Sequence, residues 1–514
     1  MYIQPNSNVW LFRDVPLCEN YEDTMDFSSA SQQWSWFANN YYAYNFSKYS
    51  YQRAMLNSIK VEKKYEDIYD CNYMAFINIS YENKVFYAFI KELKYINDNV
   101  TEIIYEIDPL QTWMFDYKLG ECFVEREHTK DDTIGANLVP ENLETGDYVD
   151  TLIAEASDLT DLVICLFCTI NEQGQDTSGT FDGRLYSGLY PVCKDQNGNW
   201  FDLTSAGVDY CVAWLNWIMR VNAVKMAVIM PKYFADRTNF ISGGEEIVAN
   251  TTLLRSDGTQ VRNNKCLCYP YNFMYVSNNN GRTVVYPYEY FTKTTQNKCQ
   301  FILVGDMTPN PSVLLVPVNY KGVNENYDES VFISGYPQIA FDVDAFKAWL
   351  AQNAGSLATS ALTMAYTQQF NSKAQGMGSS ILKYGGIHGV ISGIVGGVGA
   401  MIAPPQSMGT QQGAMMVSAG IMNFFFYNKN IRPEYATIID DYFQMFGYAC
   451  HKVKTPTAHN RVKWDYVKTV GCTVHGSLPA DEAKRIKNIY DNGIRFWHYG
   501  ATMYDYDTAN NTVL

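Results

Sequence analysis

The sequence predicts a mainly β fold of the α+β class, and three observations support this prediction. Aromatic and β-branched runs alternate with turn-like stretches over residues 1–130. Pairs of Asp or Asn with Gly, which are typical of hairpins, punctuate residues 131–300. Two further strand-like runs, QFILVG and SVLLVPV, follow near residues 300–317. At 514 residues the chain is long enough for several structural units, and 47% hydrophobic residues suffice to fill them.

The first part of the chain predicts a three-stranded meander. The runs YMAFINIS, KVFYAFIKELKYI and TEIIYEID are separated by the turn-like stretches YENK and NDN. The 40 tyrosines of the chain suit half-buried pleated surfaces and large interfaces.

Residues 131–300 predict a β-rich insert that carries one helix. Four turn dipeptides lie between apolar runs: Asp182-Gly183, Asn197-Gly198, Asp257-Gly258 and Asn280-Gly281. Part of residues 207–230 has the apolar spacing of a helix. The strand-like runs near residues 300–317 then return to β character.

The last third alternates between helices and strands. Asp344 is a predicted N-cap for an Ala-rich, nearly uncharged helix that runs to Phe370. After Asn428, EYATIIDDYFQMFGY predicts a helix and KWDYVKTVGCTVHG a pair of strands. PADEAKRIKNIYDNG predicts a final helix that Gly493 ends.

A run of about 45 residues, from Tyr384 to Asn428, contains no Lys, Arg, Asp or Glu. Its first arm comprises residues 387–403. Glycines recur at every fourth position from just before this arm, namely Gly385, Gly389, Gly393 and Gly397. In a helix these glycines form one smooth stripe that permits close contact between helices in a bilayer. Pro404 and Pro405 then interrupt any helix. A second arm, residues 413–427, ends in consecutive aromatic residues.

The run predicts a conditional membrane segment that acts in several copies. Each Ile or Val contributes about −0.3 to −0.6 kcal/mol to insertion, and the glycines and His388 oppose this gain. Each arm is also shorter than the roughly 20 residues of a membrane span. We expect bilayer contact from Ile391, Ile394, Val395, Phe424, Phe425 and Phe426. The alternative is a Gly-rich hairpin packed at a subunit interface.

Enzyme signatures are absent from the sequence, which has no GxSxG elbow, P-loop, HExxH or dinucleotide fingerprint. Glu125, Glu127 and His128 lie close together in VEREH, but alternation on a strand predicts a solvated charged strand instead of a catalytic set. Asp440-Asp441 is most simply the polar side of a helix. Paired carboxylates of a cell-wall glycosidase can come from anywhere in a sequence and stay an alternative.

The 12 cysteines predict buried thiols and not a disulfide framework. Cys165 and Cys168 would point to opposite faces of a strand, whereas Cys266 and Cys268 would share one strand face in the core. One set of metal-ligand types occurs near the C-terminus, namely Cys450, His451, Cys472 and His475. Its spacing matches no zinc module, so we interpret it as accidental and predict no cofactor and no metal.

The formal net charge of −15 excludes a nucleic-acid binder, because such proteins carry basic stripes that neutralise phosphates. An acidic surface suits a conduit through which DNA slides without sticking. The first residues, MYIQPNSNVW, lack the features of a signal peptide, so we expect synthesis and folding in a cytoplasm.

Three segments resemble a known family. Residues 105–128, YEIDPLQTWMFDYKLGECFVEREH, resemble the signature of the tail-knob, or distal tail tube, proteins of small short-tailed bacteriophages. DVPLCENYEDTMDF with QWSWF near the start, and IYDNGIRFWHYG near the end, resemble the ends of the same family. The Gly-rich hydrophobic segment in the last third is also a feature of the family.

The resemblance implies a homohexamer whose tail-tube-like β-barrel combines both chain ends. In this interpretation residues 1–130, 301–341 and 431–514 belong to the tube domain, residues 131–300 are an insert, and residues 342–430 form a helix with the membrane-active loop. The loops would plug the tube at the distal end of the virion tail and then enter the host cell membrane as a pore. The implied partners are other tail proteins, host membrane lipids, and phage DNA that passes without specific binding. A receptor-binding or purely structural tail component is the main alternative, and a cell-wall hydrolase is a further one.

Overall fold

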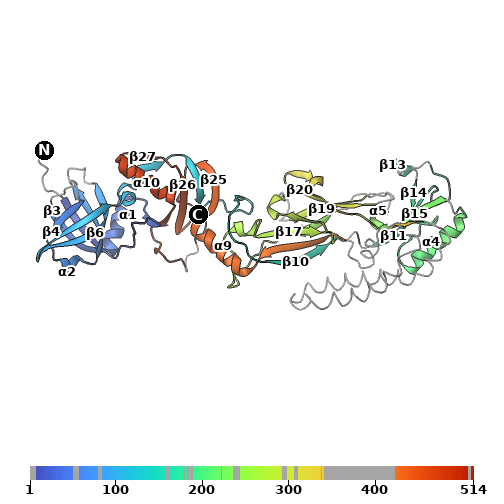
Figure 1. The fold of residues 1–514 in the computed structure, drawn as a ribbon, viewed down its shortest axis with the longest axis horizontal. Coiled ribbons are helices and arrows are strands. Elements are labelled where there is room, and N and C mark those ends of the chain that lie inside the picture. The colour runs from blue at the N-terminus through green and yellow to red at the C-terminus, as the bar shows by residue number, and fades with distance from the viewer. Residues whose placement is uncertain are drawn as a thin grey trace. The chain divides into compact units, whose positions relative to one another are not determined.

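The computed structural model of the chain is mostly β, as the sequence predicts (Figure 1). It describes residues 7–49, 57–78, 84–156, 159, 161–177, 180–181, 184–185, 189–220, 223–235, 244–279, 281–291, 298–305, 311–336, 338–340, 423–506 and 511–514. The chain divides into two compact units. Unit 1 comprises Met1–Glu144, Leu254–Cys266 and Glu434–Leu514, and unit 2 comprises Thr145–Leu253 and Leu267–Pro433.

The first sheet of unit 1 has six antiparallel strands in the order β3-β1-β5-β6-β7-β4. Their bounds are β1 Ser7–Arg13, β3 Tyr42–Tyr49, β4 Ser58–Val61, β5 Cys71–Asn78, β6 Val85–Asn97 and β7 Val100–Ile107. The predicted meander is confirmed, since β5, β6 and β7 are consecutive neighbours. Alternating residues fill a core on each face: Tyr73 and Tyr87 on one side, and Met74, Ala88 and Ile103 on the other.

The second sheet of unit 1 joins the two ends of the chain. Its order is β2-β28-β26-β9-β25, with β2 parallel to β28 and the other pairs antiparallel. The strands are β2 Asp23–Asp26, β9 Cys122–Glu127, β25 Tyr448–Lys454, β26 Trp464–Val470 and β28 Ile494–His498. Buried Asp23 accepts hydrogen bonds from Arg495 Nη1 and Trp497 Nε1, both at 2.7 Å. These bonds fix the N-terminal strand to the C-terminal one.

A two-stranded sheet and five helices complete unit 1. They are β8 Tyr117–Leu119 paired with β27 Val474–Gly476, and α1 Ala30–Asn40, α2 Tyr65–Ile68, α3 Pro109–Trp113, α9 Pro433–Phe446 and α10 Ala480–Asn492. The two last helices are confirmed, and Gly493 ends α10 with a φ of 92°. The predicted pairing of β26 with the following strand is wrong, because β27 pairs with β8 while β26 pairs with β9 and β28.

The signature in residues 105–128 ties the two larger sheets together. Buried Asp108 caps α3 by accepting hydrogen bonds from the backbone N–H groups of Leu110 and Gln111, and it also accepts one from the Tyr73 hydroxyl on β5 at 2.8 Å. Burial raises the pKa of Asp108 to about 6. Gln111 Nε2 donates to the carbonyl oxygen of Met25 on β2 at 2.8 Å. These contacts connect the signature to strand β5 of the first sheet and to strand β2 of the second, so its buried polar residues have a structural role.

Unit 2 holds three larger sheets and one small hairpin. Their orders are β10-β24-β17-β18, β14-β11-β15-β23, β16-β19-β20-β21 with β22 paired to β20, and β12-β13. The strands are β10 Tyr148–Glu155, β11 Leu162–Cys168, β12 Thr180–Phe181, β13 Arg184–Leu185, β14 Tyr190–Val192, β15 Val224–Pro231, β16 Glu245–Val248, β17 Asn272–Ser277, β18 Thr283–Tyr286, β19 Lys298–Gly305, β20 Val313–Tyr320, β21 Val323–Glu325, β22 Val331–Ile333, β23 Gln338–Ala340 and β24 Phe425–Ile431. The helices among the described residues of unit 2 are α4 Ser205–Ile218 and α5 Lys232–Ala235, and short 3-10 turns occur at Tyr288–Tyr290 and Tyr327–Glu329.

The insert agrees with the sequence in its helix and differs from it in one boundary. Part of residues 207–230 is helical, as expected, in α4, and Val224–Pro231 form strand β15, which pairs with β11. The strands at 301–341, which we expected to return to the tube domain, lie in unit 2 instead. There Phe301, Leu303 and Leu315 belong to the same hydrophobic core as Val163 and Trp214.

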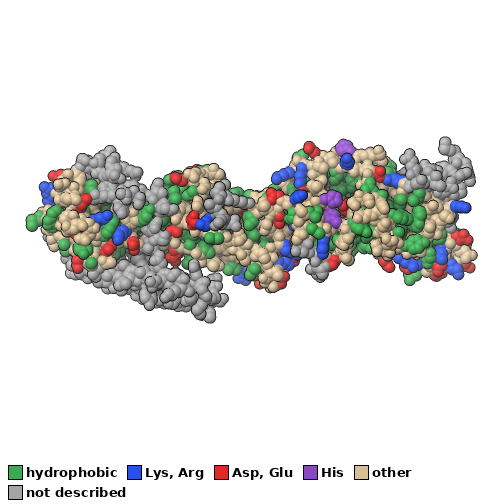
Figure 2. All heavy atoms as spheres, turned by 180° about the vertical axis from the view of Figure 1, so that it is seen from behind, with side chains coloured by type: hydrophobic (Ala, Val, Ile, Leu, Met, Phe, Trp, Pro, Cys, Tyr) green, Lys and Arg blue, Asp and Glu red, His purple; other side chains and the backbone are tan. Residues whose placement is uncertain are grey.

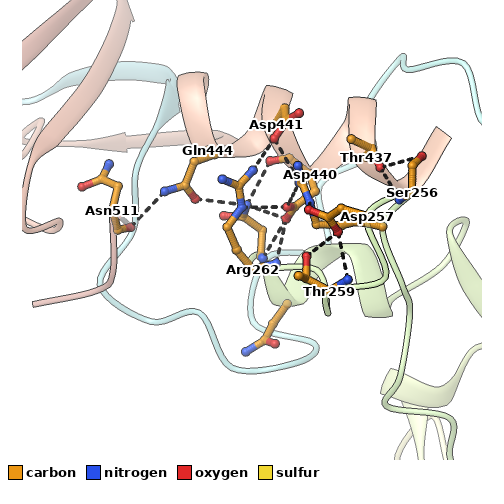
Figure 3. Close-up of polar contacts among 12 residues, drawn as sticks. Ser256, Asp257, Thr259, Arg262, Thr437, Asp440, Asp441, Gln444 and Asn511 are labelled. Carbon is orange, nitrogen blue, oxygen red and sulfur yellow. Dashed lines mark hydrogen bonds and ion pairs between the residues drawn. The ribbon is translucent and has the colours of Figure 1, made fainter. Parts of the chain in front are cut away.

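A polar cluster fastens residues 254–266 to helix α9 within unit 1 (Figure 3). Asp440 is fully buried, and its carboxylate contacts Arg255 Nη1 and accepts hydrogen bonds from Arg262 Nε at 2.8 Å and Asn263 Nδ2 at 2.9 Å. The backbone N–H groups of Arg262 and Asn263 also donate to it, at 2.9 and 3.0 Å. The prediction of a simple polar helix face is therefore wrong for Asp440, because two arginines from a distant loop make its burial possible.

We expect Asp440→Ala to lower the free energy of unfolding by about 3–5 kcal/mol, because it leaves two arginines without their buried anion. Asp441→Ala is the matched control. Its side chain contacts the same arginines but is 50% exposed, so we expect a loss of about 1 kcal/mol or less. Urea unfolding followed by tryptophan fluorescence measures both values, and equal losses would contradict the assignment.

Candidate functional site

Most of the charge-free run lies between two strands of unit 2 in the sequence, and its last residues belong to the second strand. Strand β23 precedes residues 341–422, and strand β24 follows them. Most residues expected to be membrane-active lie outside the described residues: Gly385, Gly389, Ile391, Gly393, Ile394, Val395, Gly397, Pro404 and Pro405. The predicted helix from Asp344 to Phe370 lies outside them as well.

The three phenylalanines at the end of the run belong to a folded sheet. Phe424 and Phe426 are fully buried, and Phe425 is 8% exposed. The Phe426 ring contacts that of Phe301 edge to face, with centroids 5.3 Å apart. In this structure Phe424 and Phe426 fill the core of unit 2 and Phe425 is nearly buried, so their contact with a bilayer stays a prediction. Three consecutive aromatic residues are compatible both with contact to lipid and with a buried strand. The high β propensity of phenylalanine is the signal that favours the strand.

The two flanking strands anchor the segment unequally. β24 has seven residues and lies between β10 and β17, so it makes two antiparallel ladders. β23 has three residues, occupies the edge of its sheet and pairs with β15 alone among the described strands. Burying a phenylalanine contributes about 1.5–3 kcal/mol, so the aromatic start of β24 adds to the firmer anchor. Residues 424–431 therefore belong to the folded core and sheets of unit 2.

The VEREH motif in unit 1 is more buried than predicted. Glu127, the last residue of β9, and His128, which directly follows the strand, are each 1% exposed. Register shifts in both ladders of β9, between Val124 and Arg126, break the alternation and turn Glu127 to the buried face. Glu127 contacts Lys454, and burial raises its pKa. Glu125 instead pairs with Lys468 at 2.8 Å, so the motif supports the sheet and does not form a catalytic group.

His128 is held as a neutral imidazole. Its Nδ1 accepts the Tyr466 N–H at 2.9 Å, and its Nε2 lies 3.2 Å from the Gln444 carbonyl oxygen, to which it donates. Burial lowers the pKa of His128 to about 4. A neutral ring with both nitrogens occupied is a structural element.

The cysteines are thiols in the structure, and eleven of the twelve are buried. Cys165 and Cys168 lie in β11, which is buried on both faces. Cys266 is wrongly predicted as a strand residue, because it belongs to the 3-10 turn Asn264–Leu267. The set near the C-terminus does not converge: the Cys450 thiol faces the Tyr448 carbonyl, the Cys472 thiol faces that of Lys487, and exposed His451 stacks on Phe123.

Among the residues that the structure describes, no helix combines the length and the apolar character that a membrane span requires.

Comparisons with known proteins agree with this architecture. Residues 236–511 match the family model of the C-terminal domain of Bacillus phage phi29 tail knob protein gp9, and residues 5–118 match the model of the caudoviral major tail protein N-terminus. The tail knob proteins gp9 of Bacillus phages PZA and B103 are each 24% identical to this chain. The alignment covers 96% of both chains for PZA, and 99% of this chain and 98% of the other for B103.

A solved structure shares the fold. The tail knob protein gp12 of bacteriophage C1 matches with a TM-score of 0.61 over 99% of this chain and all of that chain, at 16% identity. Fold and sequence together define a structural protein of a bacteriophage tail. The chain belongs to the phi29 gp9 tail-knob family, whose C-terminal model matches more than half of its residues. This confirms the family expected from residues 105–128 and the chain ends.

The state of His128 predicts a pH dependence. Between pH 6.5 and about 4 the unfolded chain binds a proton that the folded chain excludes, so folding stability falls as the pH falls. The loss amounts to about 3 kcal/mol over that window. We expect His128→Gln to flatten the dependence of the urea midpoint on pH in this window. His451→Gln, at an exposed site, serves as the control, and identical slopes in both variants and the parent protein would contradict the prediction.

Proposed function

We propose that this tail-knob protein assembles with further copies of itself into a hexameric tube at the distal end of the virion tail, in contact with other tail proteins. DNA passes through the lumen without specific binding. The net charge of −15 supports this role, because it disfavours adhesion of phosphates. Acidic and basic side chains are interspersed on the described surface in Figure 2, as suits a surface that does not grip nucleic acid. The match to the major tail protein N-terminus supports a tube role for unit 1.

We further propose that the charge-free segment plugs the tube and then enters the host cell membrane. The observation that carries this proposal is the position of the segment as one long insertion between β23 and β24. Both flanking strands are paired within unit 2, so the insertion can move while the unit stays folded. A single copy gains little from insertion. A ring gathers several copies, and their glycine stripes permit close packing in lipid.

Two other functions give different experimental results. A receptor-binding or purely structural tail component would use the segment as a packed interface. A cell-wall hydrolase would clear purified host walls as an isolated protein. The tail-knob names of the relatives support a structural role instead of an enzymatic one.

Deletion of residues 384–422 separates these functions. It removes the charge-free residues but keeps β24 and its buried phenylalanines, so unit 2 retains its core. We expect particles that assemble tails and adsorb to cells but fail to deliver DNA, measured by tail imaging, adsorption counts and DNA entry. Particles without tails would favour the interface role, and normal delivery would refute the membrane role.

A finer variant tests the need for an uncharged segment. Ile391→Lys with Ile394→Lys adds two charges, each costing about 2.5–3.5 kcal/mol at the centre of a membrane helix. We expect a loss of DNA delivery of at least about tenfold with normal adsorption. Ile438→Lys is the matched control, because Ile438 is 65% exposed on α9 and follows Glu434 by one helical turn. Equal infectivity of the two variants would contradict the proposal.

A further inference from the structure

Three side chains of unit 1 bring their ligand atoms together in a cluster not described above. Asp26 ends strand β2, His498 ends strand β28, and His459 lies in the connection between β25 and β26. Asp26 Oδ2 is 3.5 Å from His459 Nε2 and 3.6 Å from His498 Nδ1. All three ligand atoms lie within 4.8 Å of one another.

These separations are those of a metal coordination shell. A tetrahedral zinc ion with bonds of about 2.0–2.1 Å places its ligand atoms roughly 3.3 Å apart. Two of the separations approach this value before any adjustment by a bound ion. Two imidazoles and a carboxylate form a donor set that suits Zn²⁺ and resembles in type the sets of open zinc sites. The ion would have one free coordination position for water or a neighbouring molecule.

A second, independent contact fixes the orientation of the His498 ring. Asp465 is fully buried, and its Oδ2 lies 2.9 Å from His498 Nε2. The same oxygen accepts the N–H groups of Asn460 and Arg461 at 2.9 and 3.1 Å, which fix its position. A carboxylate that holds one ring nitrogen of a histidine leaves the other directed at the metal, as in carboxylate–histidine–zinc triads. Here the other nitrogen is Nδ1, which faces Asp26.

The exposure of the cluster fits access by an ion from solution. The His459 side chain is 66% exposed, whereas Asp26 and His498 are 17% and 15% exposed. The rings of His459 and His498 stack at 26° with centroids 5.3 Å apart, so the two side chains lie against each other. An ion can enter from the His459 side and rest against two positioned ligands.

We propose that Asp26, His459 and His498 bind one Zn²⁺ ion per chain, with Asp465 as a positioning residue. The ion joins the N-terminal strand β2, the C-terminal strand β28 and the connection that holds His459. Binding stabilises the folded state of unit 1, because the unfolded chain separates the three ligands.

Metal titration of the full-length protein tests the site. The protein is treated with EDTA, freed of the chelator, and titrated with ZnCl2 by calorimetry and with CoCl2 by visible absorption. We expect one ion per chain, a Co²⁺ spectrum of a low-coordinate nitrogen and oxygen site, and a higher melting temperature with Zn²⁺. No binding by the parent protein would overturn the proposal.

Variants separate this site from adventitious binding to surface histidines. His459→Ala alters an exposed side chain, so the protein should fold while its zinc affinity falls by at least about 100-fold. Asp465→Asn should weaken binding by about 10- to 100-fold and shift the Co²⁺ spectrum. His451→Ala, at an exposed histidine outside the cluster, should bind like the parent protein. Equal affinity of His459→Ala and His451→Ala would overturn the proposal.

Discussion

Pairing of the two chain ends in one sheet is the constraint on which the rest of unit 1 depends. β9, from the N-terminal part, lies between β25 and β26, and β2 lies beside β28. These ladders close a loop of several hundred residues, and their formation costs more chain entropy than a local hairpin does. The buried contact of Asp23 with Arg495 offsets part of that cost at one point of closure. The second sheet is incomplete until the last strand of the chain joins it.

Buried polar groups hold the parts of unit 1 in register. Asp108, Gln111 and Asp440 each satisfy several donors or acceptors contributed by elements distant in the sequence. A buried carboxylate without such partners would be costly, so each one selects a single arrangement of its neighbours.

Local patterns predicted much of the fold, and long-range contacts account for what they missed. The alternation in residues 73–107 and the Gly493 stop signal correspond to β5, β6, β7 and the end of α10. Burial of Glu127 depends on register shifts between β9 and its partner strands, which no local pattern records. The cluster of Asp26, His459 and His498 has no motif spacing, since its members come from opposite ends of the chain. The burial of Phe424, Phe425 and Phe426 in a sheet was not predicted, because hydrophobicity alone does not distinguish a sheet core from a lipid contact.

The unequal anchors of the insertion have a mechanical consequence. A pulling force along residues 341–422 would act on β23 and β24 equally. The strand with the weaker pairing would separate from its sheet first. Three residues at a sheet edge can peel away one bond at a time, whereas a central strand must break two ladders at once. Under force the segment would lengthen from its β23 end, while β24 would keep it tethered to the subunit.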